Sequence, residues 1–199
     1  ADAEDSKTSI NGTLFFNQNQ GGIALSNEDA PIISNNVISS LSTNKDYKAM
    51  GLENVSNNVM ISNNIINAAN GSYGIAMNNC TAQATNLGQI SNNSVAVGGK
   101  DQAYGLYLSG NTDNQVLNFN RVKLTINGSQ SATQAYYKNE GSGNNVNMMN
   151  NIFYDLNTGG YTIIGNTYKD YFNQLPAQSN PTLSVSANGI MIEKVSPIK

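Results

Sequence analysis

Short segments in which apolar residues flank a polar centre recur along the chain at a nearly constant interval. The hexapeptide ISNNVI at positions 33–38 is followed by ISNNII at 61–66 and ISNNSV at 90–95, with looser copies LNFNRV at 117–122 and MMNNIF at 148–153. The second asparagine of each copy follows the previous one after 28, 29, 27 and 31 residues. A period of roughly 20 to 50 residues is typical of solenoids, propellers and other repeat arrays.

A second series of apolar segments runs in phase with the first. Its members are GGIAL at 21–25, MGLEN at 50–54, YGIAM at 73–77, YGLYL at 104–108, AYYKN at 135–139 and GGYTI at 159–163. Alternation with a period of two, bounded by Asn, Gly and Ser, indicates half-buried strands. Helical repeats would need a 3.6-residue apolar period and good helix-forming residues, whereas this chain is rich in residues that favour turns and strands.

Short strands that recur once per turn predict an all-β fold, a parallel β-helix solenoid of about six coils of ~28 residues each. Equivalent residues of successive coils should stack in apolar columns that point inward. The predicted columns are Ile33, Ile61, Ile90, Leu117 and Met148; Ile38, Ile66, Val95, Val122 and Phe153; and Ile23, Leu52, Ile75 and Leu106, with Leu25, Met77 and Leu108 beside the last.

Asparagine is the most unusual feature of the composition, with 35 copies against a charged fraction of only 12%. Asn tolerates the left-handed backbone region that a sharp corner between strands requires. Buried Asn amides that stack in successive coils can also satisfy one another's hydrogen bonds. We therefore predict a structural ladder formed by the second asparagine of each copy: Asn36, Asn64, Asn93, Asn120 and Asn151.

The recurrent I-x-N-N-x-I pattern resembles the repeat of the pectate-lyase-like right-handed parallel β-helix superfamily, over roughly residues 21–165. The resemblance implies a right-handed single-chain coil and a secreted or cell-surface protein of bacterial type. It implies no single activity, because that superfamily includes polysaccharide lyases, glycoside hydrolases, esterases, phage tailspikes and adhesins.

The repeat divides the chain into three expected parts. Residues 1–20 read as an incomplete first coil or N-terminal edge, 21–168 as the β-helix coils and 169–199 as C-terminal cap strands. Stacked coils leave an open apolar core and unpaired strand edges at their ends. Because no amphipathic capping helix precedes the first coil, we expect a neighbouring domain or chain to cover the N-terminal end.

The composition excludes several classes of function. The chain has no histidine, which removes Ser-His-Asp and Cys-His catalysis and histidine metal sites. Cys80 is alone, so no internal disulfide can form. A net charge of −3 with a single arginine leaves no basic stripe for nucleic acid. No apolar run approaches the ~18 residues that would span a membrane.

The charged residues suggest little catalysis. Members of the resembled superfamily that act on polysaccharides would carry clustered Asp with Arg or Lys on adjacent coils, whereas the acidic residues here are scattered. If the protein is a lyase, Arg121 and Lys123 are the candidates for base or charge neutraliser. No cofactor is expected, with Ca²⁺ at Asp101 and Asp113 as the weaker alternative.

Tyrosines near the repeat strands suggest binding instead. We expect an outward row formed by Ala24, Glu53, Ala76, Tyr107 and either Lys138 or Asn139. Aromatic rings stack on sugar rings while neighbouring polar groups bond hydroxyls. The candidate ligand-binding residues are Glu53, Tyr107, Tyr137 and Lys138.

Three hypotheses follow from these residues. The leading one is an extracellular or cell-surface module that binds a polysaccharide or another glycan, or mediates adhesion, without its own catalytic site. The second is a polysaccharide lyase or glycoside hydrolase, complete or a fragment of one. The third is a purely structural coil stack within a larger surface protein.

Overall fold

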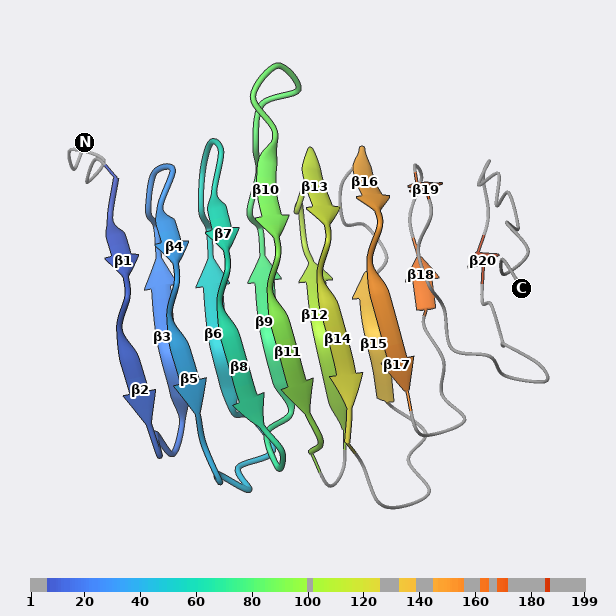
Figure 1. Cartoon of the computed structure of the whole chain (residues 1–199). Helices are drawn as coiled ribbons and strands as arrows, with labels where there is room; N and C mark the ends of the chain where they lie inside the picture. The colour runs from blue at the N-terminus through green and yellow to red at the C-terminus, as the bar shows by residue number, and fades with distance from the viewer. Residues whose placement is uncertain are drawn as a thin grey trace.

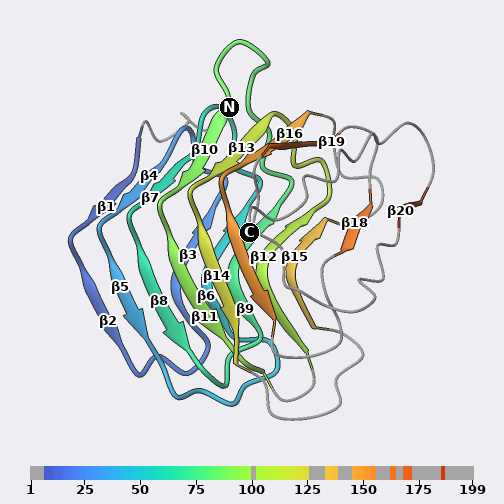
Figure 2. The same ribbon diagram turned by 45° about the vertical axis from the view of Figure 1, so that its right-hand side comes forward.

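The computed structural model describes residues 7–99, 102–125, 133–138, 145–155, 162–164, 168–171 and 185–186. All the regular elements within these residues are β-strands, as predicted. Among the described residues, no helix combines the length and apolar content needed to cross a lipid bilayer. The strands form three parallel sheets that run side by side along the molecule (Figures 1 and 2).

Each turn of the chain contributes one strand to each sheet. The first sheet contains β1 (Ser9–Asn11), β4 (Ile32–Ser34), β7 (Met60–Ser62), β10 (Gly88–Ser91), β13 (Gln115–Asn118), β16 (Val146–Met149) and β19 (Tyr168–Tyr171). The second contains β2 (Leu14–Phe16), β5 (Val37–Ser39), β8 (Ile65–Ala68), β11 (Ser94–Val97), β14 (Arg121–Leu124) and β17 (Ile152–Asp155). The third contains β3 (Gly21–Ser26), β6 (Lys48–Glu53), β9 (Tyr73–Asn78), β12 (Ala103–Ser109), β15 (Thr133–Lys138), β18 (Thr162–Ile164) and β20 (Val185–Ser186).

This arrangement is the predicted parallel β-helix solenoid. The asparagine ladder joins Asn36 to Asn151 through four successive links, so it spans about four complete turns. That number is slightly smaller than the six coils predicted, because the strands at both ends belong to turns that the ladder does not include. Right-handed winding, the hand that parallel crossovers favour, stays a prediction.

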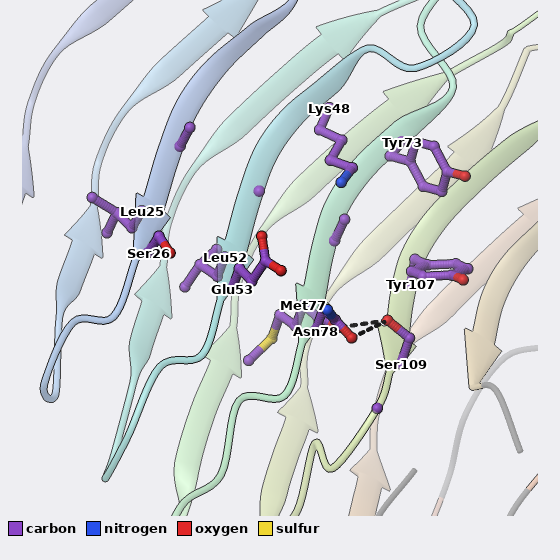
Figure 3. A pocket seen from close by; sticks show the side chains of 14 residues that line it. Leu25, Ser26, Lys48, Leu52, Glu53, Tyr73, Met77, Asn78, Tyr107 and Ser109 are labelled. Carbon is purple, nitrogen blue, oxygen red and sulfur yellow. Dashed lines mark hydrogen bonds between the residues drawn. The ribbon is translucent and has the colours of Figure 1, made fainter. Parts of the chain in front are cut away.

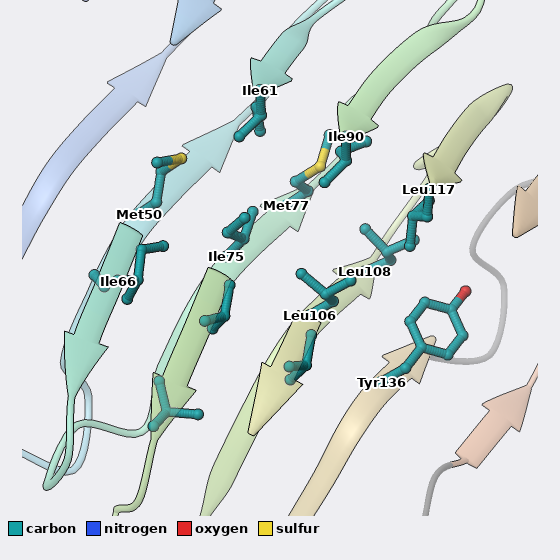
Figure 4. Close-up of a cluster of buried hydrophobic side chains, with 14 of the residues drawn as sticks. Met50, Ile61, Ile66, Ile75, Met77, Ile90, Leu106, Leu108, Leu117 and Tyr136 are labelled. Atoms are coloured by element: carbon teal, nitrogen blue, oxygen red, sulfur yellow. The ribbon is translucent and has the colours of Figure 1, made fainter. Parts of the chain in front are cut away.

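The apolar columns of the first two sheets are those predicted. In the first sheet, Ile33, Ile61 and Ile90 pair in register and are at most 1% exposed. The third sheet corrects the prediction by two residues, because Met50 rather than Leu52 stacks between Ile23 and Ile75. Leu52 lies in the neighbouring column, which also contains Leu25, Met77, Leu108 and Lys138. Figure 4 shows Met77 and Leu108 of this column beside Ile90 and Leu117 of the first sheet.

The asparagine ladder satisfies every polar atom of the amides in its middle. The Asn93 Nδ2 donates to Asn120 Oδ1 and to the Ile61 carbonyl, both at 3.0 Å. Its Oδ1 accepts from the backbone N of Asn64 at 3.0 Å and from Asn64 Nδ2 at 2.9 Å. Asn64 and Asn120 repeat this pattern. Buried amides are tolerated here because each coil presents the same partners to the next.

The two asparagines of each pair have different roles. The first takes the left-handed conformation at the corner, with φ of 56° at Asn35, 56° at Asn63 and 54° at Asn92. The second turns inward and joins the ladder. Phe119 occupies the left-handed position of its coil with φ of 56° and is 55% exposed. Such a conformation is strained for a bulky residue, so the fold enforces the corner even where the sequence departs from asparagine.

The structure describes the N-terminal end of the solenoid from residue 7 onward, but only a few residues near the C-terminal end. β1 and β2 pair in parallel with β4 and β5 and have no strand before them among the described residues. Ile10 and Phe15 pack against the core but are only partly buried, while Leu14 is 64% and Phe16 61% exposed. Most of the predicted cap at 169–199 lies outside the described residues.

Candidate functional site

A shared interruption of the alternation between inward and outward residues, in the strands of the third sheet, creates the site. In β6, β9, β12 and β15 at least two consecutive residues are buried, such as Gly105 and Leu106 in β12. The second sheet approaches closely there, because a Cβ added to Gly105 would lie 2.0 Å from Val122 Cγ1 and 2.6 Å from the Ala135 carbonyl oxygen. The interruption of the two-residue period lets Tyr104 and Tyr107, three positions apart, both face outward.

Four tyrosines form one contiguous cluster on this outward face. Tyr107 and Tyr137 stack with ring centroids 5.1 Å apart and planes 12° apart. Tyr73 and Tyr104 stack at 5.4 Å and 23°. Tyr104 also contacts Tyr107 and Tyr137 at 5.2 Å. We call these four residues the tyrosine cluster; all four side chains are partly exposed.

Two phenols of the cluster, those of Tyr73 and Tyr104, have raised pKa values. Burial, together with the neighbouring phenols of Tyr73, Tyr137 and Tyr107, raises the pKa of Tyr104 to about 12. Burial also raises the pKa of Tyr73, against the opposing effect of a hydrogen bond from Gln102. Gln102 Nε2 donates to Tyr73 Oη at 3.0 Å and to the Lys45 carbonyl at 3.3 Å. Gln102 thereby fixes one edge of the cluster to the loop before β6.

A shallow groove of about 590 Å³ extends from the cluster across β9, β6 and β3. Its floor is a row of small residues, Ala24, Gly51 and Ala76, which pair in register and continue into Tyr107 and Tyr137. The flanking rows form its sides, and Figure 3 shows their side chains around the groove. The lining on those sides is Lys48 and Tyr73 in one row, and Ser26, Glu53, Asn78 and Ser109 in the other.

The groove presents charge and hydrogen-bonding groups beside aromatic rings. The Lys48 ammonium lies 6.0 Å from the centroid of the Tyr73 ring. Ser109 Oγ donates to Asn78 Oδ1 at 3.1 Å. The exposed Glu53 carboxylate stands in the same row as Asn78. A ligand in the groove would therefore meet an ammonium on one side and acceptors with a hydroxyl on the other.

The predicted ligand-binding residues are only partly brought together. Tyr107 and Tyr137 lie side by side, and Glu53 lines the groove but in a different row from Tyr107. The prediction for Lys138 was wrong in its orientation, since this residue is 1% exposed and points into the core column. Because Ala135 and Tyr136 are both buried, the alternation of inward and outward side chains shifts by one position after them. Tyr137 therefore faces outward and Lys138 faces inward. Burial lowers the pKa of Lys138, and the Asp113 carboxylate partly offsets this.

The other candidate residues lie elsewhere. Arg121 and Lys123 are exposed on the second sheet, and their strand neighbours Ser94, Ala96 and Ile152 carry no charge. Asp101 falls outside the described residues, so its pairing with Asp113 stays a prediction. Within the described ranges, no group of three or more Cys, Asp or Glu side chains is placed to share a metal ion.

Sequence reasoning missed Lys48, Asn78 and Ser109 as lining residues. Lys48 and Tyr73 are register partners at the start of β6 and β9. Aligning the segment MGLEN with YGIAM instead places Met50 opposite Tyr73, so the sequence did not reveal this pair. A glycine inside a strand pattern, as at Gly74 and Gly105, is a known signal of a bend or close backbone approach. That signal could have located the reversal that brings the tyrosines together.

Comparison with models of protein families, with curated proteins and with solved structures finds no match to this chain. The fold and the groove therefore rest on the chain's own residues, and the resemblance to the pectate-lyase-like superfamily finds support only at the level of a parallel β-helix.

Proposed function

We propose that this chain is an extracellular glycan-binding module whose site is the tyrosine cluster together with the adjoining groove. The observation that carries the proposal is the contact of four tyrosine rings on one outward face, beside a groove lined by Lys48, Glu53, Asn78 and Ser109. Extended sites of this kind suit a polymer, because the groove crosses several coils along the solenoid axis.

The physical argument combines apolar stacking with polar recognition. The flat face of a sugar ring loses water when it packs on an aromatic ring, and its hydroxyls need hydrogen-bond partners at the rim. The floor of Ala24, Gly51 and Ala76 leaves room for such a ring. The rigid sheet holds the tyrosines in place before binding, which reduces the entropy cost of ordering them.

Glycan-array screening followed by titration calorimetry tests this proposal. Tyr107→Ala and Tyr137→Ala should each weaken binding by about fivefold or more, since an aromatic contact contributes about 1 kcal/mol beyond its area burial. Tyr107→Phe should retain most of the affinity, because the ring remains. Phe16→Ala, which removes a ring that is 61% exposed on the second sheet, is the matched control.

Other outcomes would identify the alternative functions. Binding that survives both alanine substitutions would refute the site. Unsaturated products or new reducing ends released from uronate polymers, and lost in Arg121→Gln or Lys123→Gln, would favour a lyase or hydrolase. Inertness in both the binding and the cleavage assays would favour a structural coil stack.

A further inference from the structure

We propose that the tyrosine cluster is a site of oxidative modification, where Tyr107 and Tyr137 couple to form a dityrosine that joins β12 to β15. This inference is independent of glycan binding. It starts from the geometry of the pair, whose Cα atoms are register partners in parallel strands. The ring centroids are 5.1 Å apart and the planes differ by 12°. Among the described ring pairs, this one has the shortest centroid distance and the smallest angle between planes.

Among the side chains that the structure describes, several features direct one-electron oxidation toward this cluster. The chain contains no tryptophan and no histidine, two of the side chains that compete for such oxidants. Cys80 is buried and its pKa is raised to about 11, so it supplies almost no thiolate at neutral pH. Tyr47 and Tyr136 are fully buried, whereas the four cluster tyrosines reach the surface.

The cluster also gives a radical several places to reside. Tyr104 contacts Tyr73, Tyr107 and Tyr137 within 5.4 Å. A phenoxyl radical formed on any ring can therefore pass to the stacked pair by exchange with a neighbouring phenol. The exposed thioether of Met60 belongs to the first sheet and reacts chiefly with two-electron oxidants that transfer oxygen.

Coupling of the two phenols requires hydrogen peroxide as the oxidant and a haem peroxidase as the catalyst. Each phenol loses one electron and its hydroxyl proton, and the two phenoxyl radicals join through the ring carbons next to their oxygens. The hydrogens on those two carbons then move to the oxygens and restore both phenols. One carbon–carbon bond replaces two carbon–hydrogen bonds. The two electrons and two protons released reduce one hydrogen peroxide to two water molecules.

The product would be a covalent cross-link between neighbouring coils. Residues 107 and 137 lie on successive turns, so the new bond closes a loop of the chain and restricts the unfolded state, as a disulfide does. Thiols do not cleave the carbon–carbon bond of dityrosine, so this cross-link would persist in environments that reduce disulfides. The oxidised protein should therefore unfold at a higher temperature than the untreated protein.

Treatment of the full chain with a haem peroxidase and hydrogen peroxide tests the proposal. Monomeric product should show dityrosine fluorescence and an intact mass lower by two hydrogens, and peptide mapping should join the segments that contain Tyr107 and Tyr137. Tyr107→Phe and Tyr137→Phe keep the ring packing but cannot form the radical, so each should lose this cross-link. Tyr47→Phe is the buried control and should retain it.

Three results would overturn the assignment. The first is a cross-link of unchanged yield in Tyr107→Phe. The second is a cross-link that maps only to Tyr73 and Tyr104, the other stacked pair. The third is dityrosine found only in dimers and larger species, which would mean that the cluster meets another molecule before its own neighbours react.

Discussion

Replacement of Asn93 by alanine removes the central member of the asparagine ladder. Asn93 is 1% exposed, and its amide takes part in four hydrogen bonds of 2.9–3.0 Å. Alanine keeps the backbone conformation but removes all four. The Ile61 carbonyl and the Asn64 amide then face a small buried space, where water has little access.

The expected cost follows from the number of bonds. A typical intramolecular hydrogen bond contributes about 1 kcal/mol net, so the four lost bonds predict a loss of about 4 kcal/mol in the free energy of unfolding. Asn36→Ala should cost less, about 3 kcal/mol, because its amide makes three such bonds and its partners Thr13 and Ile10 lie at the partly exposed end.

Urea unfolding followed by circular dichroism measures these losses as shifts of the midpoint at constant slope. Asn67→Ala is the control, because Asn67 is exposed on β8 and should change stability by less than about 0.5 kcal/mol. A loss below about 1 kcal/mol for Asn93→Ala, or one no larger than that of Asn67→Ala, would show that the ladder is not a major source of stability.

Two further substitutions test the side on which residues lie. Ile66→Ala should lower the free energy of unfolding in urea by about 2–4 kcal/mol, because it opens a cavity in the core. The neighbouring Ile65 is 53% exposed, so Ile65→Ala should be nearly neutral. Equal losses for the two variants would contradict the assignment of inward and outward sides. The pKa of Lys138 is lowered on folding, so the unfolded state binds more protons and stability should rise with pH between the folded pKa and the ordinary value of 10.5. Lys138→Met should flatten that rise in unfolding curves measured from pH 7 upward, and an unchanged slope would assign it to other groups.

Much of the fold could be predicted because the same pattern of apolar residues and paired asparagines recurs in each coil. Positions such as Ile33 and Ile61 must be apolar wherever a strand faces the core, and the Asn pair must supply one left-handed residue and one buried amide in each turn. The ladder residues and two of the three columns follow from that rule alone.

The site could be predicted only in part, because the third sheet departs from the sequence pattern both in register and, at Lys138, in the side that faces inward. A shift of two residues leaves the inward and outward sides unchanged, so no hydrophobic pattern distinguishes Met50 from Leu52 as the partner of Ile23. The pairing is decided by how the strands fit together once the coils are stacked.

The sequence by itself determined the strands, their period, the inward columns of the first two sheets and the ladder, since each depends on local polarity repeated at a fixed interval. Only the tertiary structure decided that the alternation in the third sheet is interrupted where Gly105 lies close to Val122. The same interruption in β15 accompanies the burial of Lys138, and Tyr73, Tyr104, Tyr107 and Tyr137 gather on one face. The reason is physical: close contact between two sheets reverses the alternation within a strand, and the contact joins residues that are distant in the chain.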